Sequence, residues 1–295
     1  MQAVKKATGV LLMAATIAAA VAAAPAAAEV KLGVLAPRGE LVANNEWGKM
    51  AKHFSDALGE PVKLVALPPA KLVDAVKTGE VDYVLPNSAQ MVLLAEKHGA
   101  KPLATLNGPD GPVFAGVIVA KKGSGIATAE QLRGKHAMTL GDTAAGAYIF
   151  QAHYLSKKGV DVEKHLGKRT KGTKQDDLVL AVQAGLADVA FVRSGQLEAM
   201  EKEGKIRMSD FVIVDERRSA KFKLRHTTAL YPEWYLAATP KASPKQSELL
   251  KAVALAVRPD SAAAAAAKVT GFVEPLPLND LKDALKTLKL PPYGG

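Results

Sequence analysis

The sequence predicts an α/β protein of two lobes that enclose a ligand cleft and are joined by two crossing segments. Apolar, β-branched segments alternate with helical segments along the chain, which is typical of a mostly parallel sheet with helices on both faces. This alternation begins afresh in the middle of the chain. Residues 72–90 and 178–196 are also alike, with eight identities in nineteen positions at a constant offset of 106.

The two similar segments read LVDAVKTGEVDYVLPNSAQ and LVLAVQAGLADVAFVRSGQ. Each predicts an amphipathic helix, a turn at a glycine (Gly79 or Gly185), a short strand and a polar loop. Self-similarity at a fixed offset indicates a repeated structural unit. Convergence of two short helix–strand units is the alternative, because the chain is rich in Ala and Val. We interpret the copies as the facing walls of one cleft.

The first 28 residues are predicted to be a cleaved signal peptide rather than part of the fold. Lys5 and Lys6 precede a long apolar run, and three alanines before Glu29 offer a small-residue cleavage site. An uncleaved membrane anchor is the alternative, since the run approaches the length that spans a bilayer. Its Ala-rich, Leu-poor composition and Pro25 favour export.

The mature chain opens with regularly alternating elements. A strand buried on both faces is expected at Val30–Leu35, and the loop APRGE follows it. The spacing of apolar residues then predicts a helix over 47–58. A second strand at 62–67, a helix at 71–78 and a third strand at 81–85, ending in PNSAQ, complete this part.

The middle of the chain repeats the alternation. Strands are expected at 113–120, 136–140 and 211–214, with a helix starting at GDTAAGAY and a polar, basic linker over 160–177. Tyr235–Thr239 is expected to carry the chain back into the first lobe, and helices follow at 247–257, 262–267 and 278–288.

These elements divide the chain into a first lobe of 29–115 plus 232–295 and a second lobe of 116–231. Ligands on open parallel sheets bind beyond the carboxyl ends of the strands. Four polar loops are predicted there, with the sequences APRGE, PNSAQ, GDTAAG and VRSGQ. The cleft is therefore expected between these loops.

Composition excludes several classes of function. The chain has no cysteine, which excludes disulfides, thiolate metal sites, a cysteine nucleophile and a cysteine-linked lipid anchor. Without Lys5 and Lys6, 37 basic residues face 29 acidic ones, a net charge of +8. Such a basic exported protein suits an anionic ligand, a membrane face or solubility. Nucleic acid is a poor fit, because the basic residues are dispersed and few aromatics lie among them.

Two arginines end apolar strands at the predicted cleft. A guanidinium offers a planar fork of donors and stays charged, so it suits carboxylates, phosphates and other oxyanions. Arg193 follows the apolar VAFV, and Asn87 takes its place in the first copy, so packing does not require an arginine there. Arg38, beside Gly39, has the same character. A surface arginine or an exposed turn is the alternative for each.

The GDTAAG turn supplies backbone donors. The N–H groups of Ala144, Ala145 and Gly146 would be free at a helix start, which makes a ready anion site. Thr143 could donate its hydroxyl to a ligand or cap the helix.

Further polar residues are expected to complete the shell. Asn87, Ser88 and Ser194 lie in the repeated loops, although helix capping is the alternative for the serines. His226 and Thr227 lie in a polar, aromatic segment that returns toward the first lobe, so His226 could reach the cleft or hold the hinge.

Enzyme and metal sites find no support. The chain lacks G-x-S-x-G, H-E-x-x-H and G-x-x-x-x-G-K-[ST]. Its six histidines show no close metal-ligand spacing. We therefore expect no catalytic residue, no metal and no cofactor.

Four stretches together resemble the periplasmic phosphate/phosphite/phosphonate-binding proteins of ABC transporters: VKLGVLAPRG, GEVDYVLPNSAQ, ATAEQLRGKHAMTLGDTAAGAY and GLADVAFVRSG. The likeness covers essentially the whole mature chain. It implies a type II periplasmic binding-protein fold that closes around ligand by hinge motion. APRG, FVRSG, LYPEW and LKLPPY are further similar to the periplasmic sensor domain of tetrathionate-responsive histidine kinases.

Two departures from the family bear on the ligand. Family members that bind phosphonates usually have a hydroxyl-rich helix start, whereas residues 143–146 carry one hydroxyl. They also tend to place a carboxylate near the position of Arg193 to receive an ammonium group. An arginine there argues for a ligand that is anionic throughout, such as a sulfur oxyanion.

The sequence thus predicts a monomeric periplasmic protein that traps a small oxyanion for the membrane permease of an ABC transporter. The alternative partner is a membrane histidine kinase, to which the loaded protein would dock as a sensor. A two-lobed enzyme is the third class, and it lacks a candidate nucleophile or acid–base pair.

Overall fold

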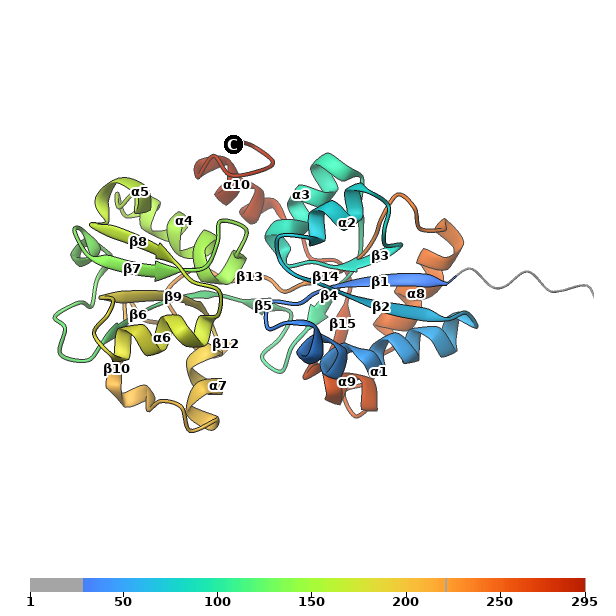
Figure 1. Cartoon of the computed structure of the whole chain (residues 1–295), viewed down its shortest axis with the longest axis horizontal. Helices are drawn as coiled ribbons and strands as arrows, with labels where there is room; N and C mark the ends of the chain where they lie inside the picture. The colour runs from blue at the N-terminus through green and yellow to red at the C-terminus, as the bar shows by residue number, and fades with distance from the viewer. Residues whose placement is uncertain (1–28, 221, 295) are drawn as a thin grey trace, which may run out of the picture.

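The computed structural model describes residues 29–220 and 222–294, so the predicted signal peptide lies outside the described residues. The described chain forms two α/β lobes that lie side by side (Figure 1). This confirms the predicted two-lobed α/β class.

The first lobe contains a mixed sheet. Its strands are β1 (Val30–Leu35), β2 (Val62–Leu67), β3 (Tyr83–Leu85), β4 (Lys101–Asn107), β14 (Tyr235–Ala238) and β15 (Gly271–Val273). They lie in the order β15-β4-β14-β3-β1-β2. β1 pairs in parallel with β2 and β3, whereas β14 is antiparallel to both of its neighbours and β15 is antiparallel to β4.

Helices cover both faces of this sheet. The helices are α1 (Glu40–Leu58), α2 (Leu72–Lys77), α3 (Ser88–His98), α8 (Pro244–Leu255) and α9 (Ala262–Ala267). Buried residues of α1, α8 and α9 share one apolar cluster with the sheet, including Trp47, Phe54 and Leu250. Those of α2 and α3 share another, including Leu72 and Met91. The sheet is therefore buried on both faces.

The second lobe repeats the plan. Its strands are β6 (Gly116–Lys121), β7 (His136–Thr139), β8 (Lys168–Lys171), β9 (Val189–Arg193) and β10 (Phe211–Ile213), in the order β10-β6-β9-β7-β8. β7 pairs in parallel with β8 and β9, while β6 is antiparallel to β9 and β10. The trios β2-β1-β3 and β8-β7-β9 are thus equivalent, and each ends on an antiparallel neighbour.

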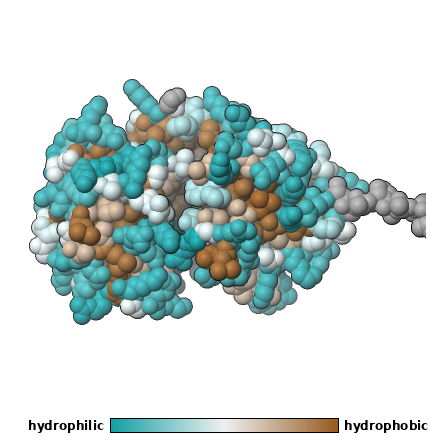
Figure 2. All heavy atoms as spheres, in the orientation of Figure 1, coloured by the Kyte–Doolittle hydropathy of each residue, from teal (hydrophilic) through white to brown (hydrophobic). Residues whose placement is uncertain are grey.

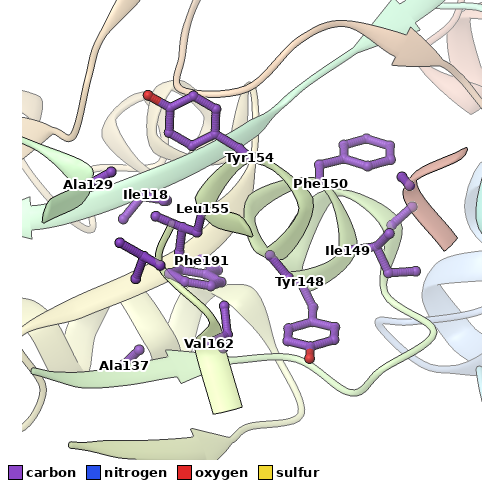
Figure 3. Close-up of a cluster of buried hydrophobic side chains, with 14 of the residues drawn as sticks. Ile118, Ala129, Ala137, Tyr148, Ile149, Phe150, Tyr154, Leu155, Val162 and Phe191 are labelled. Atoms are coloured by element: carbon purple, nitrogen blue, oxygen red, sulfur yellow. The ribbon is translucent and has the colours of Figure 1, made fainter. Parts of the chain in front are cut away.

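Two helical layers enclose the second sheet as well. One layer holds the 3₁₀ helix η1 (Ala129–Leu132), the π-helical turn η2 (Ala145–Ile149), α4 (Phe150–Lys157) and α5 (Val162–His165); the other holds α6 (Gln175–Gln183), α7 (Gln196–Lys202) and the 3₁₀ helix η3 (Met208–Asp210). Figure 3 shows part of the first layer's core, where Leu155 of α4 and Val162 of α5 lie among the strand residues Ile118 and Phe191.

The remaining strands and the last helix connect the lobes or border them. β5 (Val113–Phe114) and β13 (Tyr231–Pro232) pair where the chain crosses between lobes. β11 (Arg217–Ser219) and β12 (Phe222–His226) form a hairpin on the second lobe. The last helix, α10 (Asn279–Thr287), packs against both α3 and α4 and shares their apolar cluster. None of the described helices is long and apolar enough to cross a bilayer.

Several predicted elements differ from the structure. The sheets are mixed rather than mostly parallel. α1 begins at Glu40, seven residues before the predicted start, because the apolar residues of its first turns do not follow the spacing of a buried face and Leu41 is 75% exposed. The predicted strand at 113–120 divides at Ala115 into β5 and β6. β8 lies within the predicted linker, since its sequence KRTK has the charged character of a protected edge strand.

Candidate ligand-binding cleft

A cavity of about 970 Å³ lies between the lobes, and the molecular surface is hollowed there (Figure 2). Loops that follow strands of both lobes form part of its wall, as expected for ligands beyond strand ends. The predicted site residues that line it are Arg38, Asn87, Thr143, Ala144, Ala145, Gly146, Arg193 and Ser194. Of the other predicted residues, Gly39, Ser88, His226 and Thr227 are not part of this lining.

Loops of the two lobes contact each other beside the cavity. Arg38, in the loop after β1, pairs with Asp176 at the start of α6, with 3.2 Å between Nη2 and Oδ1. Asn87, between β3 and α3, donates its Nδ2–H to the carbonyl of Thr143 at 3.2 Å. Each contact joins the first lobe to the second, so the described conformation has the lobes touching.

Arg193 is the last residue of β9, and its guanidinium reaches the cavity with 33% of the side chain exposed. Nη2 donates to Glu233 Oε1 at 2.5 Å, and the guanidinium carbon lies 4.6 Å from the centre of the Phe114 ring. The backbone N–H donates to Gln175 Oε1 at 2.7 Å. These contacts orient the guanidinium, and its remaining N–H donors make no hydrogen bond with residues 29–220 or 222–294.

Gly146 allows the close packing around this arginine. A Cβ atom at position 146 would lie 2.5 Å from a ring carbon of Phe114 and 3.0 Å from Arg193 Cβ. Any other residue would push the ring or the arginine away. The glycine of the GDTAAG turn therefore fixes how near Arg193 lies to the turn.

The backbone donors of this turn differ in part from the expectation. The N–H of Ala144 donates to Gly141 O at 2.9 Å, so it is not free. The N–H groups of Ala145 and Gly146, at the start of η2, have no acceptor in the described part of the chain. Ala144 occupies the N-cap position, so Thr143 does not cap the helix, and its side chain is exposed at the cavity.

Ion pairs anchor the same turn to β8. Asp142 accepts from Arg169 Nη2 and from Lys171 Nζ, both at 2.6 Å. Arg169 is 8% exposed and lies over the ring of Tyr148 at 3.7 Å. Burial alone would raise the pKa of Asp142, but the hydrogen bonds from Lys171 and Arg169 outweigh it and hold that pKa below its usual range.

Asp176 is a second anchoring carboxylate. Besides Arg38, it accepts from Gln196 Nε2 at 2.9 Å and from Lys205 Nζ at 2.7 Å. Burial favours a higher pKa, yet the hydrogen bonds from Lys205 and Arg38 prevail and lower the pKa of Asp176.

Glu233 was not identified from the sequence, where it lies in the connection before β14. Its side chain is only 7% exposed, and its Oε2 is buried without a hydrogen-bond partner among the described residues. We expected an arginine in place of the carboxylate that relatives tend to have there, and the structure has both side by side. The carboxylate comes from a residue 40 positions away, which no local pattern could reveal.

The cavity carries little excess charge. Its basic residues are Arg38, Lys174, Arg193, Lys205 and Lys268, and its acidic residues are Glu46, Asp110, Asp176, Asp177, Glu203 and Glu233. The chain's net positive charge is thus not concentrated there. An anion would have to be recognised by directed donors rather than by the overall potential.

The two repeated serines do not cap helices. Asn87 caps α3 in a capping box with Gln90, and the hydroxyl of Ser88 is buried without a described partner. Ser194 Oγ instead accepts the N–H of Ala115, next to β5, at 3.1 Å. Ser194 therefore ties the second lobe to the crossing segment.

His226 and Thr227 are buried within the second lobe. His226 Nδ1 lies 2.9 Å from Leu224 O, and its ring meets Phe222 edge-on at 5.2 Å. The hydroxyl of Thr227 donates to Val214 O at 2.8 Å and accepts from the N–H of Ile118 at 3.0 Å. These bonds fasten the returning segment to β6 and do not point to a ligand.

Comparison with known proteins gives a family match. The family model described as "ABC transporter, phosphonate, periplasmic substrate-binding protein" matches residues 32–279. The tetrathionate sensor histidine kinase TtrS of Salmonella typhimurium is 34% identical over 218 residues, which are 72% of this chain and 37% of that protein. The chain therefore spans well under half the length of this relative.

Solved structures share the fold at low sequence identity. PhnD1 from Prochlorococcus marinus, in complex with methylphosphonate, is 15% identical with a TM-score of 0.71, covering 88% of this chain and 98% of that one. A binding-protein component of a phosphonate ABC transporter from Pseudomonas aeruginosa is 15% identical with a TM-score of 0.73, covering 89% and 87%. XAC2383 from Xanthomonas citri, bound to ATP, is 17% identical with a TM-score of 0.73, covering 88% and 98%.

Proposed function

The chain belongs to the family of periplasmic substrate-binding proteins of phosphonate ABC transporters, and from this membership we propose that it traps a small oxyanion between its lobes and delivers it to a membrane permease. The oxyanion is a phosphate- or phosphonate-like ion or a sulfur oxyanion. The protein acts as a monomer in the periplasm after removal of residues 1–28, and it is not an enzyme.

The observation that carries this proposal is the arrangement around Arg193. One edge of its guanidinium is held by Glu233 and one face by Phe114, so the remaining N–H donors are oriented before any ligand arrives. The N–H groups of Ala145 and Gly146, which have no acceptor among the described residues, lie in the same lining beside Arg193. Together these groups would form a cradle for one oxyanion.

The positions of Arg38 and Asn87 indicate how the two lobes would close around a ligand. Arg38 and Asn87 reach across to the second lobe, and the paired strands β5 and β13 lie where the chain crosses. We place the hinge at these strands, at the boundary between 29–115 plus 232–295 and 116–231. Ligand binding would shift the population toward the conformation in which both cross-lobe contacts form.

The second candidate function is sensing. The 34% identity to a tetrathionate sensor histidine kinase favours it, because the matched part covers 72% of this chain. In that role the loaded protein would dock on a membrane histidine kinase instead of a permease.

The test is a thermal-shift screen of the mature chain against phosphate, phosphite, methylphosphonate, aminoethylphosphonate, sulfate, thiosulfate and tetrathionate. A ligand at about 100 times its Kd should stabilise the folded protein by about 2.7 kcal/mol, a shift of several degrees. Choline and glucose serve as non-anionic controls. A protein that no oxyanion stabilises would contradict the proposal.

A further inference from the structure

Gln151, the second residue of α4, has a polar side chain that is completely buried. Its Nε2 group donates to Gly146 O at 2.8 Å and to Val192 O at 2.9 Å. A third carbonyl oxygen, that of Val117, lies 3.2 Å from the same nitrogen. These carbonyl groups belong to η2, β9 and β6. One side chain therefore connects the turn of the candidate anion site to two strands of the second lobe's sheet.

The bond to Val192 O holds the peptide group that precedes Arg193. The carbonyl of this peptide group accepts from Gln151, and its N–H, which belongs to Arg193, donates to Gln175 Oε1 at 2.7 Å. Both ends of the peptide group are thus held, and with them the direction in which the arginine side chain leaves the strand. The bond to Gly146 O holds η2 at one of the two residues whose N–H groups have no acceptor among the described residues.

A glycine in β6 makes room for the glutamine. Gly116 is the first residue of β6 and lies directly opposite Arg193 in the pairing of β6 with β9. A Cβ atom at position 116 would lie 2.6 Å from the amide carbon of Gln151. Any side chain at this position would displace the amide, so the three bonds of Gln151 depend on Gly116.

Packing alone does not explain a glutamine at position 151. Its Oε1 atom is buried without a hydrogen-bond partner in residues 29–220 and 222–294. A buried acceptor without a partner costs free energy, which an apolar side chain of similar size would avoid. An apolar side chain would not supply the two N–H donors of an amide, however. These donors are what the glutamine adds at this place in the fold.

We propose that Gln151 is the positioning residue of the oxyanion site. It holds η2 and the end of β9 in one arrangement, so that Arg193 and the turn at 145–146 reach a bound oxyanion together. Gln151 itself is not part of the cavity lining and acts only through these groups. The inference rests on the proposed function and adds to it a residue that does not touch the ligand.

The first experiment measures Kd by calorimetry with phosphate, methylphosphonate and thiosulfate, and stability by urea unfolding. Gln151→Leu keeps much of the volume but removes the donors, so it should weaken binding by about tenfold or more. Gly116→Ala should weaken binding similarly, because its methyl group displaces the amide. Thr239→Val is the matched control. Thr239 is 5% exposed, lies outside the cavity lining and donates to Val81 O at 3.0 Å, so its loss should reduce stability without reducing affinity.

The second experiment measures the pH dependence of Gln151→Glu. The ionised carboxylate cannot donate to the carbonyl groups, whereas the protonated form donates one hydrogen bond. Because burial raises the pKa of such a carboxyl group, the affinity of this variant relative to the parent protein should recover severalfold between about pH 8 and about pH 5. The parent protein at the same pH corrects for titration of the ligand and of Glu233. A side chain that only fills space would give no such recovery.

The outcomes separate the inference from the proposed function. Weaker binding in Gln151→Leu and Gly116→Ala, with unchanged affinity in Thr239→Val, supports the inference. Affinity equal to the parent's in Gln151→Leu, or an equal loss in Thr239→Val, overturns it and leaves oxyanion binding standing. If Gln151→Leu does not fold, the pH profile of Gln151→Glu decides, and a profile without recovery overturns the inference. A parent protein that binds none of the three ions would contradict the inference and the proposed function together.

Discussion

The two similar segments, 72–90 and 178–196, form the same structure and make corresponding hydrogen bonds. Asp82 accepts the N–H of Lys31 at 2.8 Å and donates its own N–H to Lys31 O at 2.9 Å. Asp188 makes the same two bonds with His136, at 2.7 and 2.9 Å. Each aspartate therefore joins its strand to the start of the neighbouring parallel strand.

The repeated glutamines, Gln90 and Gln196, also make equivalent hydrogen bonds. Gln90 Nε2 donates to Pro69 O, just before α2, at 3.2 Å. Gln196 Nε2 donates to Asp176 Oδ1, in the first turn of α6, at 2.9 Å. In both lobes this bond ties the start of one helix to the start of the helix before it.

The copies differ where they face the cavity. Asn87 caps α3, whereas Arg193, at the same place in the second copy, ends β9 and pairs with Glu233. Two residues before each copy, at the same offset of 106, Ala70 corresponds to Asp176, which bonds Arg38 and Lys205. Residues that are identical in the two copies therefore form the corresponding structure of the two cleft walls. Residues that differ between the copies supply the charged groups of the cleft.

The largest expected effect comes from Arg193. Arg193→Ala should weaken oxyanion binding by at least about a hundredfold, because a directed, charge-assisted fork is lost. Arg193→Lys should also bind poorly, since a point charge does not replace the planar fork. Asn87→Ala, the matched change in the first copy, should lower affinity by less than about tenfold and stability by about 1 kcal/mol through the lost cap. Calorimetry and urea unfolding measure both quantities.

A double variant separates binding from stability at this position. Arg193→Ala leaves the buried Glu233 without its cation, so some loss of stability is expected. Adding Glu233→Gln should restore much of that stability without restoring binding. If Asn87→Ala impairs binding as severely as Arg193→Ala, the asymmetry between the copies is wrong.

The second prediction compares two glycines in corresponding loops. Gly146→Ala should reduce affinity more than about tenfold and stability by about 1–3 kcal/mol, because the new methyl group meets Phe114 and Arg193. Gly39→Ala has open space but a φ of 93°, so it should cost about 1–2 kcal/mol of stability through backbone strain. Its affinity should stay close to that of the parent protein. Equal losses of affinity would contradict the close packing at Gly146.

The third prediction tests the shared positions. Asp82→Ala and Asp188→Ala should each lower the free energy of unfolding by about 1–3 kcal/mol, because each leaves a strand N–H without its acceptor. The two losses should agree within about 1 kcal/mol, and neither variant should change ligand specificity. A near-neutral result for one aspartate would show that the copies are not equivalent.

The smallest effect concerns pH. The lowered pKa of Asp176 means that its stabilising contribution is fully present above the unfolded value of about 3.9 and is lost as the pH falls through the lower folded value. Asp176→Ala, which converts this position to the residue of the first copy, should therefore flatten the fall in stability between about pH 5 and about pH 3. Urea unfolding across this range measures the slope. Asp110→Ala is the control, since Asp110 lines the cavity but forms no ion pair with the described residues. If Asp110→Ala flattens the fall in stability as much as Asp176→Ala does, the assignment of this fall to Asp176 is wrong.

Much of the fold was predictable because buried strands have a plain sequence pattern. Val30–Leu35 and Val62–Leu67 are strands with the predicted bounds, since both are apolar and bounded by turns. β8 was not predictable in this way, because its sequence KRTK is charged and lacks an apolar pattern, as is common at a sheet edge. β14 lies within the segment predicted to carry the chain back into the first lobe, but its antiparallel place between β3 and β4 depends on pairing that no local pattern encodes.

The site was less accessible to sequence reasoning. Polar loops after apolar strands identify where Arg38 and Arg193 lie, because strand ends place them at the cavity. Glu233 and Asp176 were missed, since their roles arise from contacts between residues distant in the chain. His226 and Thr227 show the opposite case, in which polar side chains near the crossing satisfy the backbone of their own lobe.

The position of β14 between β3 and β4 determines the order in which the two lobes can complete their folding. Along the sequence, β4 is followed by all the strands of the second lobe's sheet. β14, which pairs with β4, comes only after them. The second lobe, whose five strands come from the continuous stretch 116–213, can assemble as soon as that stretch has emerged. The sheet of the first lobe remains incomplete until nearly the whole chain is synthesised. The lobe that begins the sequence is therefore the one that finishes folding last.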